Sequence, residues 1–118
     1  MCNQMVVDQV SDAEVDRIFQ ALADATRRDI IRRAMLQEQS VSALARNYEM
    51  SFAAVQKHVA VLERASLVVK QRRGREQLVH GNPEGLNRAM ELLRAYDEIW
   101  RARASRIGEI LSDDRQGH

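Results

Sequence analysis

The sequence predicts a mainly α-helical domain with one small β-hairpin, in the order α-α-α-α-β-β-α. Only one proline and five glycines interrupt its 118 residues, which favours helices. Apolar residues recur at helical spacing through most of the chain. A single stretch, residues 67–80, instead places β-branched and apolar residues on both sides of a charged tip. A chain of this length favours one compact domain with a modest core, which would gain from pairing with a second copy.

The first two helices are predicted from their caps and their apolar spacing. Ser11 and Glu14, three residues apart, form a capping box at the start of the first helix. Asp24 is a suitable N-cap for the second helix. The apolar face of the first helix is expected to contain Val15, Ile18, Phe19 and Leu22. That of the second is expected to contain Ile30, Ile31, Ala34 and Met35.

The next two helices are short and joined with little slack. The first is expected to be capped near Ser40, and a tight connection through residues 48–50 leads to Ser51, the N-cap of a helix that ends near Ser66. Apolar or small groups stand where a helix-turn-helix needs them to hold two helices at a steep angle: Leu44, Ala45, Tyr48, Met50 and Val55. The pattern therefore predicts a helix-turn-helix whose second helix protrudes.

This protruding helix has two different faces. Val55, Val59 and Leu62 fall on one face and are typical of core. The opposite face carries small, amide and cationic groups, namely Phe52, Ala53, Gln56, Lys57 and Ala60. Such a helix fits the DNA major groove, where small residues allow close approach, Gln56 can bond adenine, and Lys57 can reach guanine or a phosphate. The N–H groups that follow Ser51 suit a phosphate.

Residues 67–72 and 76–80 are predicted to form the hairpin, with Gly74 available for a positive φ in the turn. Its tip is basic, and residues 51–80 carry a net charge of +4, whereas the whole chain carries +1. A local basic patch on a nearly neutral chain indicates a polyanionic partner. Arg72, Arg73 and Arg75 are expected to straddle a DNA backbone or enter the minor groove.

The last helix is expected over residues 84–111, with Asn82 as N-cap and Pro83 at its first position. Leu86, Leu93, Trp100 and Ile107 recur every seven residues, with Ala89, Tyr96 and Ile110 beside them. An apolar stripe of this length needs a partner surface. Its own domain and a second chain are both possible partners, and we favour the second chain.

Three stretches carry a resemblance to a known family: LADATRRDIIRRAM, VSALARNYEMSFAAVQKHVAVLERASLV and RRGREQLVHGNPEGL. They resemble the ArsR-type winged-helix repressors of bacteria, in the same order, over roughly residues 15–111. The resemblance implies a winged helix-turn-helix homodimer that represses transcription at an imperfect palindrome near its own promoter. It also implies a dimer interface made by the terminal helices, which here carry Val15, Ile18, Phe19, Leu86, Leu93, Tyr96, Trp100 and Ile107.

The residues expected to contact double-stranded DNA are Ser40, Ser51, Phe52, Ala53, Gln56, Lys57, His58, Arg72, Arg73 and Arg75. Two of them have an alternative role. Phe52 either touches a thymine methyl group or packs on the preceding turn. His58 either packs and orients its helix or, as the family motif implies, contacts a phosphate. Two departures from the family pattern are Glu49, where glycine is usual in the turn, and Gln56, where serine is common.

Other classes of function find little support in the sequence. Cys2 is the only cysteine, so it offers neither an internal disulfide nor a cysteine pair for zinc, and a redox role would need a second chain. The helix before the recognition helix has no cysteine and the last helix no histidine, so we expect no metal site and no cofactor, and no inducer is indicated. No nucleophile–base set or glycine-rich phosphate loop indicates an enzyme.

The remaining predictions concern organisation and location. We expect residues 10–111 to form the DNA-binding and dimerisation domain, with flexible tails at residues 1–9 and 112–118. No signal peptide and no apolar run long enough for a membrane span is present, so the cytoplasm is the expected compartment. The alternative to a DNA-binding regulator is a winged-helix protein–protein interaction module without its own operator.

Overall fold

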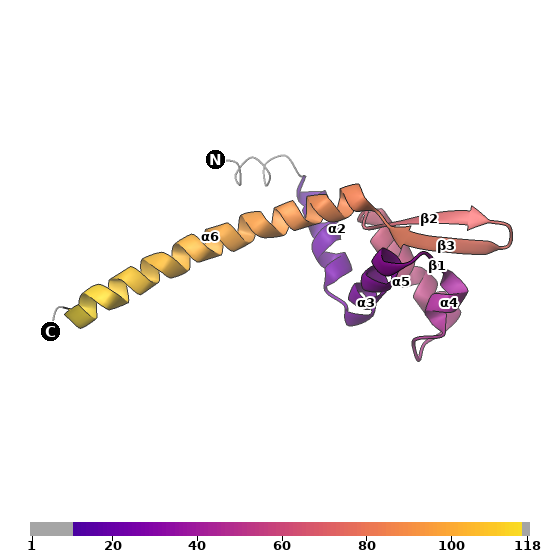
Figure 1. Ribbon diagram of the computed structural model, residues 1–118, viewed down its shortest axis with the longest axis horizontal. Coiled ribbons are helices and arrows are strands. Elements are labelled where there is room, and N and C mark those ends of the chain that lie inside the picture. Colours follow the sequence, from indigo (N-terminus) through magenta and orange to yellow (C-terminus); the bar gives the residue numbers. More distant parts are fainter. Residues whose placement is uncertain (1–10, 117–118) are drawn as a thin grey trace. The chain divides into compact units, whose positions relative to one another are not determined.

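The computed structural model describes residues 11–116, with side chains described through residue 111. Within the described residues, the chain divides into two compact units, residues 11–89 and residues 90–116. The elements are α2 (Asp12–Leu22), α3 (Ala25–Leu36), β1 (Gln39–Ser40), α4 (Val41–Ala45), α5 (Phe52–Arg64), β2 (Val68–Arg73), β3 (Glu76–Gly81) and α6 (Pro83–Gln116) (Figure 1). Helix α6 begins in the first unit and continues in the second.

The predicted caps of the helices before the hairpin are confirmed. The Ser11 hydroxyl accepts the N–H of Glu14 at 3.2 Å, and the Asp24 carboxylate accepts the N–H of Arg27 at 3.0 Å. The Ser40 hydroxyl caps α4 in the same way. Each cap satisfies one of the free N–H groups at a helix start, a contribution of about 1 kcal/mol. These short polar side chains therefore set where the helices begin.

The sheet has one strand more than the sequence predicts. Strands β2 and β3 form the expected antiparallel hairpin, and the two-residue strand β1 pairs with the other edge of β3, giving the order β1-β3-β2. Gly74 has a φ of 64° and Arg75 does not have a positive φ, which is the pattern of a type II′ turn. The predicted need for glycine at this position is confirmed.

The core of the first unit lies between the helices and the inner face of the hairpin. Its fully buried side chains include Ile30, Leu44, Val55, Val59, Leu62, Leu67 and Val79. Ile30 and Ile31 of α3 are buried as predicted, but the prediction for Met35 is wrong, because this side chain is 59% exposed near the end of α3. Met35 is the second-last residue of α3, and the buried face of this helix ends at Ala34.

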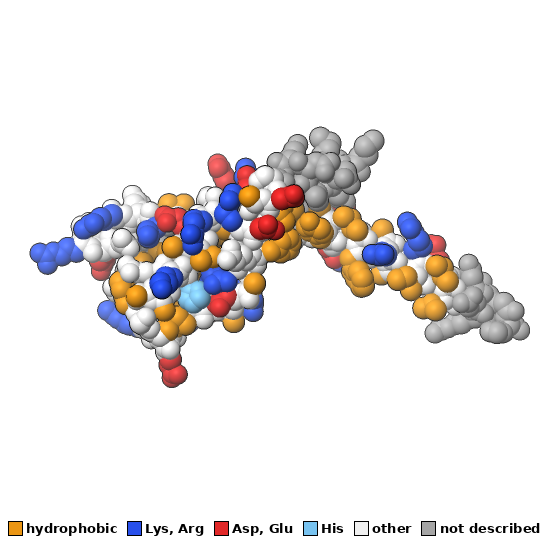
Figure 2. Space-filling model, turned by 180° about the vertical axis from the view of Figure 1, so that it is seen from behind, with side chains coloured by type: hydrophobic (Ala, Val, Ile, Leu, Met, Phe, Trp, Pro, Cys, Tyr) orange, Lys and Arg blue, Asp and Glu red, His pale blue; other side chains and the backbone are white. Residues whose placement is uncertain are grey.

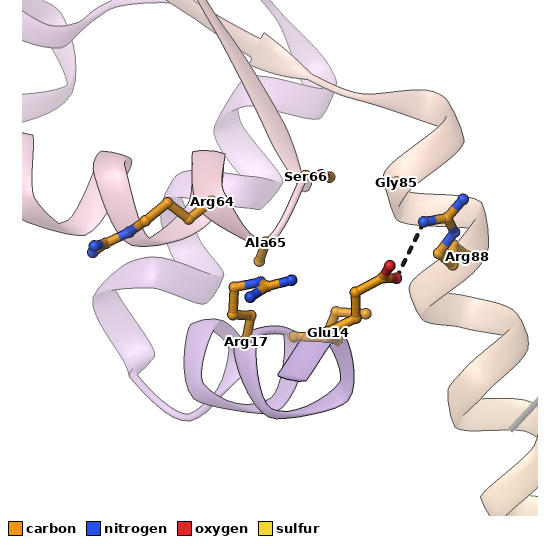
Figure 3. A pocket seen from close by; sticks show the side chains of 8 residues that line it. Glu14, Arg17, Arg64, Ala65, Ser66, Gly85 and Arg88 are labelled. Atoms are coloured by element: carbon orange, nitrogen blue, oxygen red, sulfur yellow. Dashed lines mark hydrogen bonds and ion pairs between the residues drawn. The ribbon is translucent and has the colours of Figure 1, made fainter. Parts of the chain in front are cut away.

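Helix α5 ends in a Schellman motif that brings the chain close to the start of α6. Leu67 N–H bonds to Leu62 O at 3.0 Å and Ser66 N–H to Glu63 O at 2.9 Å, with Ser66 at a φ of 61°. The Ser66 carbonyl then accepts the Asn82 side-chain amide at 3.0 Å. Figure 3 shows Ser66 and Gly85 beside a cavity of about 110 Å³, next to the ion pair of Arg88 with Glu14.

Helix α6 starts at Pro83, as predicted, and extends to Gln116, beyond the predicted end at residue 111. Residues 112–116 contain no proline or glycine, and the next glycine is Gly117, so nothing in the sequence stops the helix earlier. Cys2 and the predicted N-terminal tail lie outside the described residues. Among the described helices, none has the length and apolar character needed to cross a bilayer.

Candidate nucleic-acid interface

Helix α5 buries one face and exposes the other. Val55, Val59 and Leu62 are at most 1% exposed, and α5 contacts α2, α3, α4 and β2. On the opposite face Phe52, Ala53, Gln56 and Lys57 are exposed, and Ala60 is half-buried. The four exposed residues form the recognition strip. Contacts from four elements fix the helix, so the strip is held at a defined place on the surface.

The start of α5 offers free hydrogen-bond donors. The Ser51 hydroxyl accepts the N–H of Ala54 at 3.1 Å, and the Ser51 carbonyl accepts that of Val55 at 3.1 Å. Among the described residues, the N–H groups of Phe52 and Ala53 have no partner. Unpaired N–H groups at a helix start, together with the helix dipole, favour a phosphate.

A groove of about 230 Å³ separates the recognition strip from the hairpin. Its lining comes from α4, α5 and the two hairpin strands and consists of Val41, Ser42, Phe52, Gln56, Arg72, Arg75, Glu76 and Gln77. Phe52 is 46% exposed and forms part of one wall. Ser42 and Gln77 were not predicted from the sequence. Ser42 stands two residues after the Ser40 cap, on the exposed side of a five-residue helix whose length the sequence does not fix.

The three arginines of the hairpin differ in how they are held. Arg72 Nε donates to Gly74 O at 3.3 Å, so this side chain is folded over the turn. Arg73 lies 3.7 Å from Glu38, an exposed and weak ion pair. Arg75 has no ion-pair partner among residues 11–111. Figure 2 shows Lys and Arg side chains projecting from the hairpin.

The turn between α4 and α5 is anchored to α3. Tyr48 donates its hydroxyl proton to Asp29 at 2.7 Å, and Asp29 also accepts from Arg33 at 2.8 Å and Arg32 at 2.9 Å. These hydrogen bonds, with that from Tyr48 the strongest, hold the pKa of the Asp29 carboxyl well below its ordinary value of 3.8. Burial, and then the bond to Asp29, raises the pKa of Tyr48 to about 12. Glu49, in the same turn, is exposed.

His58 lies half-buried at the edge of α5 and is held from another helix. Arg27 Nη1 lies 3.1 Å from His58 Nδ1, while the same guanidinium donates to Gln20 O at 2.7 Å and Ala21 O at 3.1 Å. Arg27 thereby joins the end of α2, the start of α3 and the recognition helix. Sequence patterns do not indicate this role of Arg27, because 31 residues separate Arg27 from His58.

The apolar residues expected at a dimer interface fall into two groups. Ile18 is 3% exposed and belongs to the core, so its burial needs no second chain; Val15 and Leu86 are half-buried, and Phe19 is 39% exposed. In the second unit, α6 exposes Leu93, Tyr96, Trp100 and Ile107, between 42% and 64% of each side chain. Figure 2 shows hydrophobic side chains along this helix. These four residues are called the α6 apolar face below.

Comparisons with known proteins agree with this geometry. No family model matches the chain. The HTH-type transcriptional regulator Rv2034 of Mycobacterium tuberculosis is 32% identical over 99 residues, which are 84% of this chain and 90% of that protein. An ArsR-like transcriptional regulator from Rhodococcus sp. RHA1 is 32% identical, covers 83% of this chain and 92% of its own, and superposes with a TM-score of 0.66.

Two further solved structures share the fold. The crystal structure of an ArsR family transcriptional regulator is 28% identical, covers 78% of this chain and 95% of its own, and gives a TM-score of 0.70. A homodimeric winged helix-turn-helix DNA-binding domain from Mycobacterium bovis is 24% identical and superposes with a TM-score of 0.60. The match covers 75% of this chain and 88% of the Mycobacterium bovis chain. Identity of 32% over most of both chains shows that this protein belongs to the ArsR family of winged helix-turn-helix transcriptional regulators.

Proposed function

We propose that this regulator binds a palindromic operator in double-stranded DNA as a homodimer and represses transcription there. The observation that carries the proposal is the recognition strip on α5, which is exposed and stands beside a groove bounded by the basic hairpin. Neither feature serves the core. Both have the chemistry that DNA recognition requires, with amide and cationic groups for base edges and arginines for phosphates.

The recognition strip would enter the major groove. Ala53 allows the helix backbone to come close to the bases, and Gln56 presents an amide that can bond adenine N6 and N7. Lys57 has no ion-pair partner among residues 11–111, so its charge is available for guanine or a phosphate. The free N–H groups of Phe52 and Ala53 would hold a phosphate at the groove edge.

The hairpin would act as the wing on the DNA backbone. Arg72 and Arg75 line the groove next to the recognition strip, together with Ser42 and Gln77. These side chains supply two positive charges and neutral donors within one concave surface, which Glu76 also lines with one negative charge. The hairpin can therefore contact the phosphates of the DNA strand beside the major groove that α5 occupies.

Homodimerisation is supported by the α6 apolar face. Four large apolar side chains exposed along one helix are typical of a surface that another chain covers. The Mycobacterium bovis domain that shares this fold is a homodimer. Two copies would place two recognition strips on DNA, and a two-fold protein matches a palindromic site.

We assign it the role of a repressor, since a dimer seated on an operator near its own promoter would block access to that promoter. We expect no catalytic activity, and we expect the protein in the bacterial cytoplasm, where its DNA partner would be. Its inducer is not indicated by any of these features.

Fluorescence anisotropy with the DNA upstream of its own gene tests the proposal. We expect sequence-selective binding that weakens steeply with salt, and Lys57→Ala should lower the log–log salt slope by about 0.9, because one phosphate contact is lost. Arg17→Ala is the matched control, since this exposed arginine lies outside the recognition strip and the groove. Absence of selective binding at low salt would favour the protein–protein interaction module instead.

A further inference from the structure

Among the described residues, the guanidinium of Arg27 has three partners, of which one is a side chain. Its Nε and Nη2 atoms donate to the carbonyl oxygens of Ala21 and Gln20, at 3.1 Å and 2.7 Å. Its Nη1 atom faces Nδ1 of His58 at 3.1 Å. The two carbonyls lie in the last turn of α2, where a cation is favoured by the helix dipole. The two carbonyl oxygens therefore hold the guanidinium of Arg27 in place independently of His58.

The contact with Arg27 requires an acceptor at Nδ1 of His58. A guanidinium is always protonated in proteins and has donors only. His58 Nδ1 must then be the acceptor, which requires a neutral ring that carries its proton on Nε2. A protonated ring, or the other neutral tautomer, would place an N–H against the N–H of Arg27. The hydrogen bond with Arg27 can therefore form with only one of the three forms of His58, the neutral tautomer that carries its proton on Nε2.

The remaining ring nitrogen of His58 faces solvent. His58 Nε2 has no hydrogen-bond partner among the described residues, and none of their buried side-chain nitrogen or oxygen atoms lacks a partner. Nε2 is therefore accessible to solvent. His58 directly follows Lys57 on α5, at the boundary between the recognition strip and the core.

We propose that Arg27 is a positioning residue for DNA binding, which holds His58 neutral with its Nε2–H directed at a backbone phosphate. This inference rests on the proposed DNA-binding function. It assigns to His58 the role of a neutral donor, in contrast to the cationic Lys57 beside it. A neutral donor fixes the position of the phosphate without adding charge, so it contributes to register more than to long-range attraction.

Two substitutions separate the two nitrogen atoms of the ring. His58→Gln places an amide N–H near the position of Nε2 and removes the acceptor for Arg27. His58→Asn places an amide oxygen near the position of Nδ1, retains the acceptor, and removes the outward donor. A histidine that only packs against Arg27 would be replaced better by asparagine, whereas a histidine that donates to DNA would be replaced better by glutamine.

DNA affinity of the full chain, measured by fluorescence anisotropy on its operator, tests the proposal. We expect His58→Asn to weaken binding about tenfold, because a hydrogen bond to a charged phosphate is lost, and His58→Gln to weaken it less. Neither variant should change the salt slope, since a neutral group releases no counter-ion. His80→Asn and His80→Gln are the matched controls, because among residues 11–111 the His80 side chain bonds only its neighbour Gly81.

The state of the ring is measured directly by ¹⁵N NMR of the histidine side chains in the free protein. We expect a proton on Nε2 and a hydrogen-bonded, unprotonated Nδ1 in the wild type, and a changed Nδ1 signal in Arg27→Met. A wild-type ring protonated at Nδ1, or asparagine that replaces His58 better than glutamine, would overturn the inference. If the wild type binds no operator at all, the proposed function fails instead.

Discussion

Glycine at position 85 allows the start of α6 to pack closely against the backbone of Ser66, at the end of α5. Ser66 ends α5 at a φ of 61°, and its carbonyl points at the start of α6. A β-carbon at position 85 would overlap the carbonyl oxygen of Ser66 and come within 2.6 Å of its carbonyl carbon. Both atoms belong to the backbone, so a side chain at position 85 could be accommodated only by moving the chain.

We therefore expect Gly85→Ala to lower the free energy of unfolding by about 1–3 kcal/mol, as overpacking against a fixed backbone does. Urea denaturation monitored by circular dichroism measures the change. Gly108→Ala is the control, because a β-carbon at position 108 meets nothing within 4 Å. There the substitution should raise stability by about 0.5–1 kcal/mol through the better helix propensity of alanine. Equal effects at the two positions would contradict this account.

The carboxylate of Asp29 on α3 holds the turn of the helix-turn-helix in place through its hydrogen bond from Tyr48. The folded state holds its pKa below the ordinary value, so the ionised form stabilises the fold at pH above about 4. This stabilisation is lost as the pH falls through the folded-state pKa. Tyr48 supplies the strongest of the hydrogen bonds that cause the shift.

We expect Tyr48→Phe to lower the free energy of unfolding by about 1–2 kcal/mol at pH 7, because a bond to a charged group is removed. The difference from the wild type should narrow only as the pH falls from about 4 towards the lowered folded-state pKa of Asp29, where the carboxylate in the folded protein becomes protonated. Thermal or urea unfolding at pH 7 and at low pH measures both quantities. A difference that is the same at every pH would show that Tyr48 acts through packing alone.

Residue-level prediction was most successful where the cause is local. Ser11, Asp24 and Ser51 were identified as caps because each bonds an N–H three residues away. The contact between Arg27 and His58 was not identified, because it depends on how α2, α3 and α5 pack. The apolar spacing also predicted Met35 in the core. That prediction failed because Met35 lies near the end of α3, beyond the part of the helix that the core covers.

At the scale of elements, the order of helices and hairpin strands was predicted and strand β1 was not. A strand of two residues has no periodicity to detect, and its partners on β3 lie some 40 positions further along the chain. The groove between α4, α5 and the hairpin depends on this packing. The sequence does not indicate Ser42 and Gln77, because their places in the groove depend on how α4 and the hairpin pack.

The hairpin yields a prediction about its arginines. Arg75→Ala should weaken operator binding and reduce the salt slope by about 0.9, since its charge is unpaired among residues 11–111 and available to a phosphate. Arg73→Ala should reduce the slope less, because Glu38 lies 3.7 Å away and already balances part of that charge. Salt titrations of both variants give the comparison. A wild-type slope in Arg75→Ala would exclude the hairpin from the interface.

At the scale of the whole molecule, we propose that the α6 apolar face joins two copies of the protein. We expect Ile107→Lys, at a side chain that is 49% exposed, to shift the protein from dimer to monomer while the fold of residues 10–89 is retained. A charge in an apolar interface loses its hydration without gaining a partner. Analytical ultracentrifugation measures the change in association.

Met35→Lys is the control for this variant, because Met35 is 59% exposed on α3 and lies outside the α6 apolar face. It should leave the association unchanged. If Ile107→Lys and the wild type sediment alike, the α6 apolar face does not form the contact between the two copies.

Hydroxyl-radical footprinting of the wild-type protein on the DNA upstream of its gene tests the central claim most directly. Two copies that each insert α5 into a major groove should protect two half-sites of an inverted repeat, with centres about one helical turn, roughly 34–36 Å, apart. Lys57→Ala should weaken both protected stretches together. A single protected stretch, or protection without two-fold symmetry in the sequence, would contradict a homodimer that reads a palindrome.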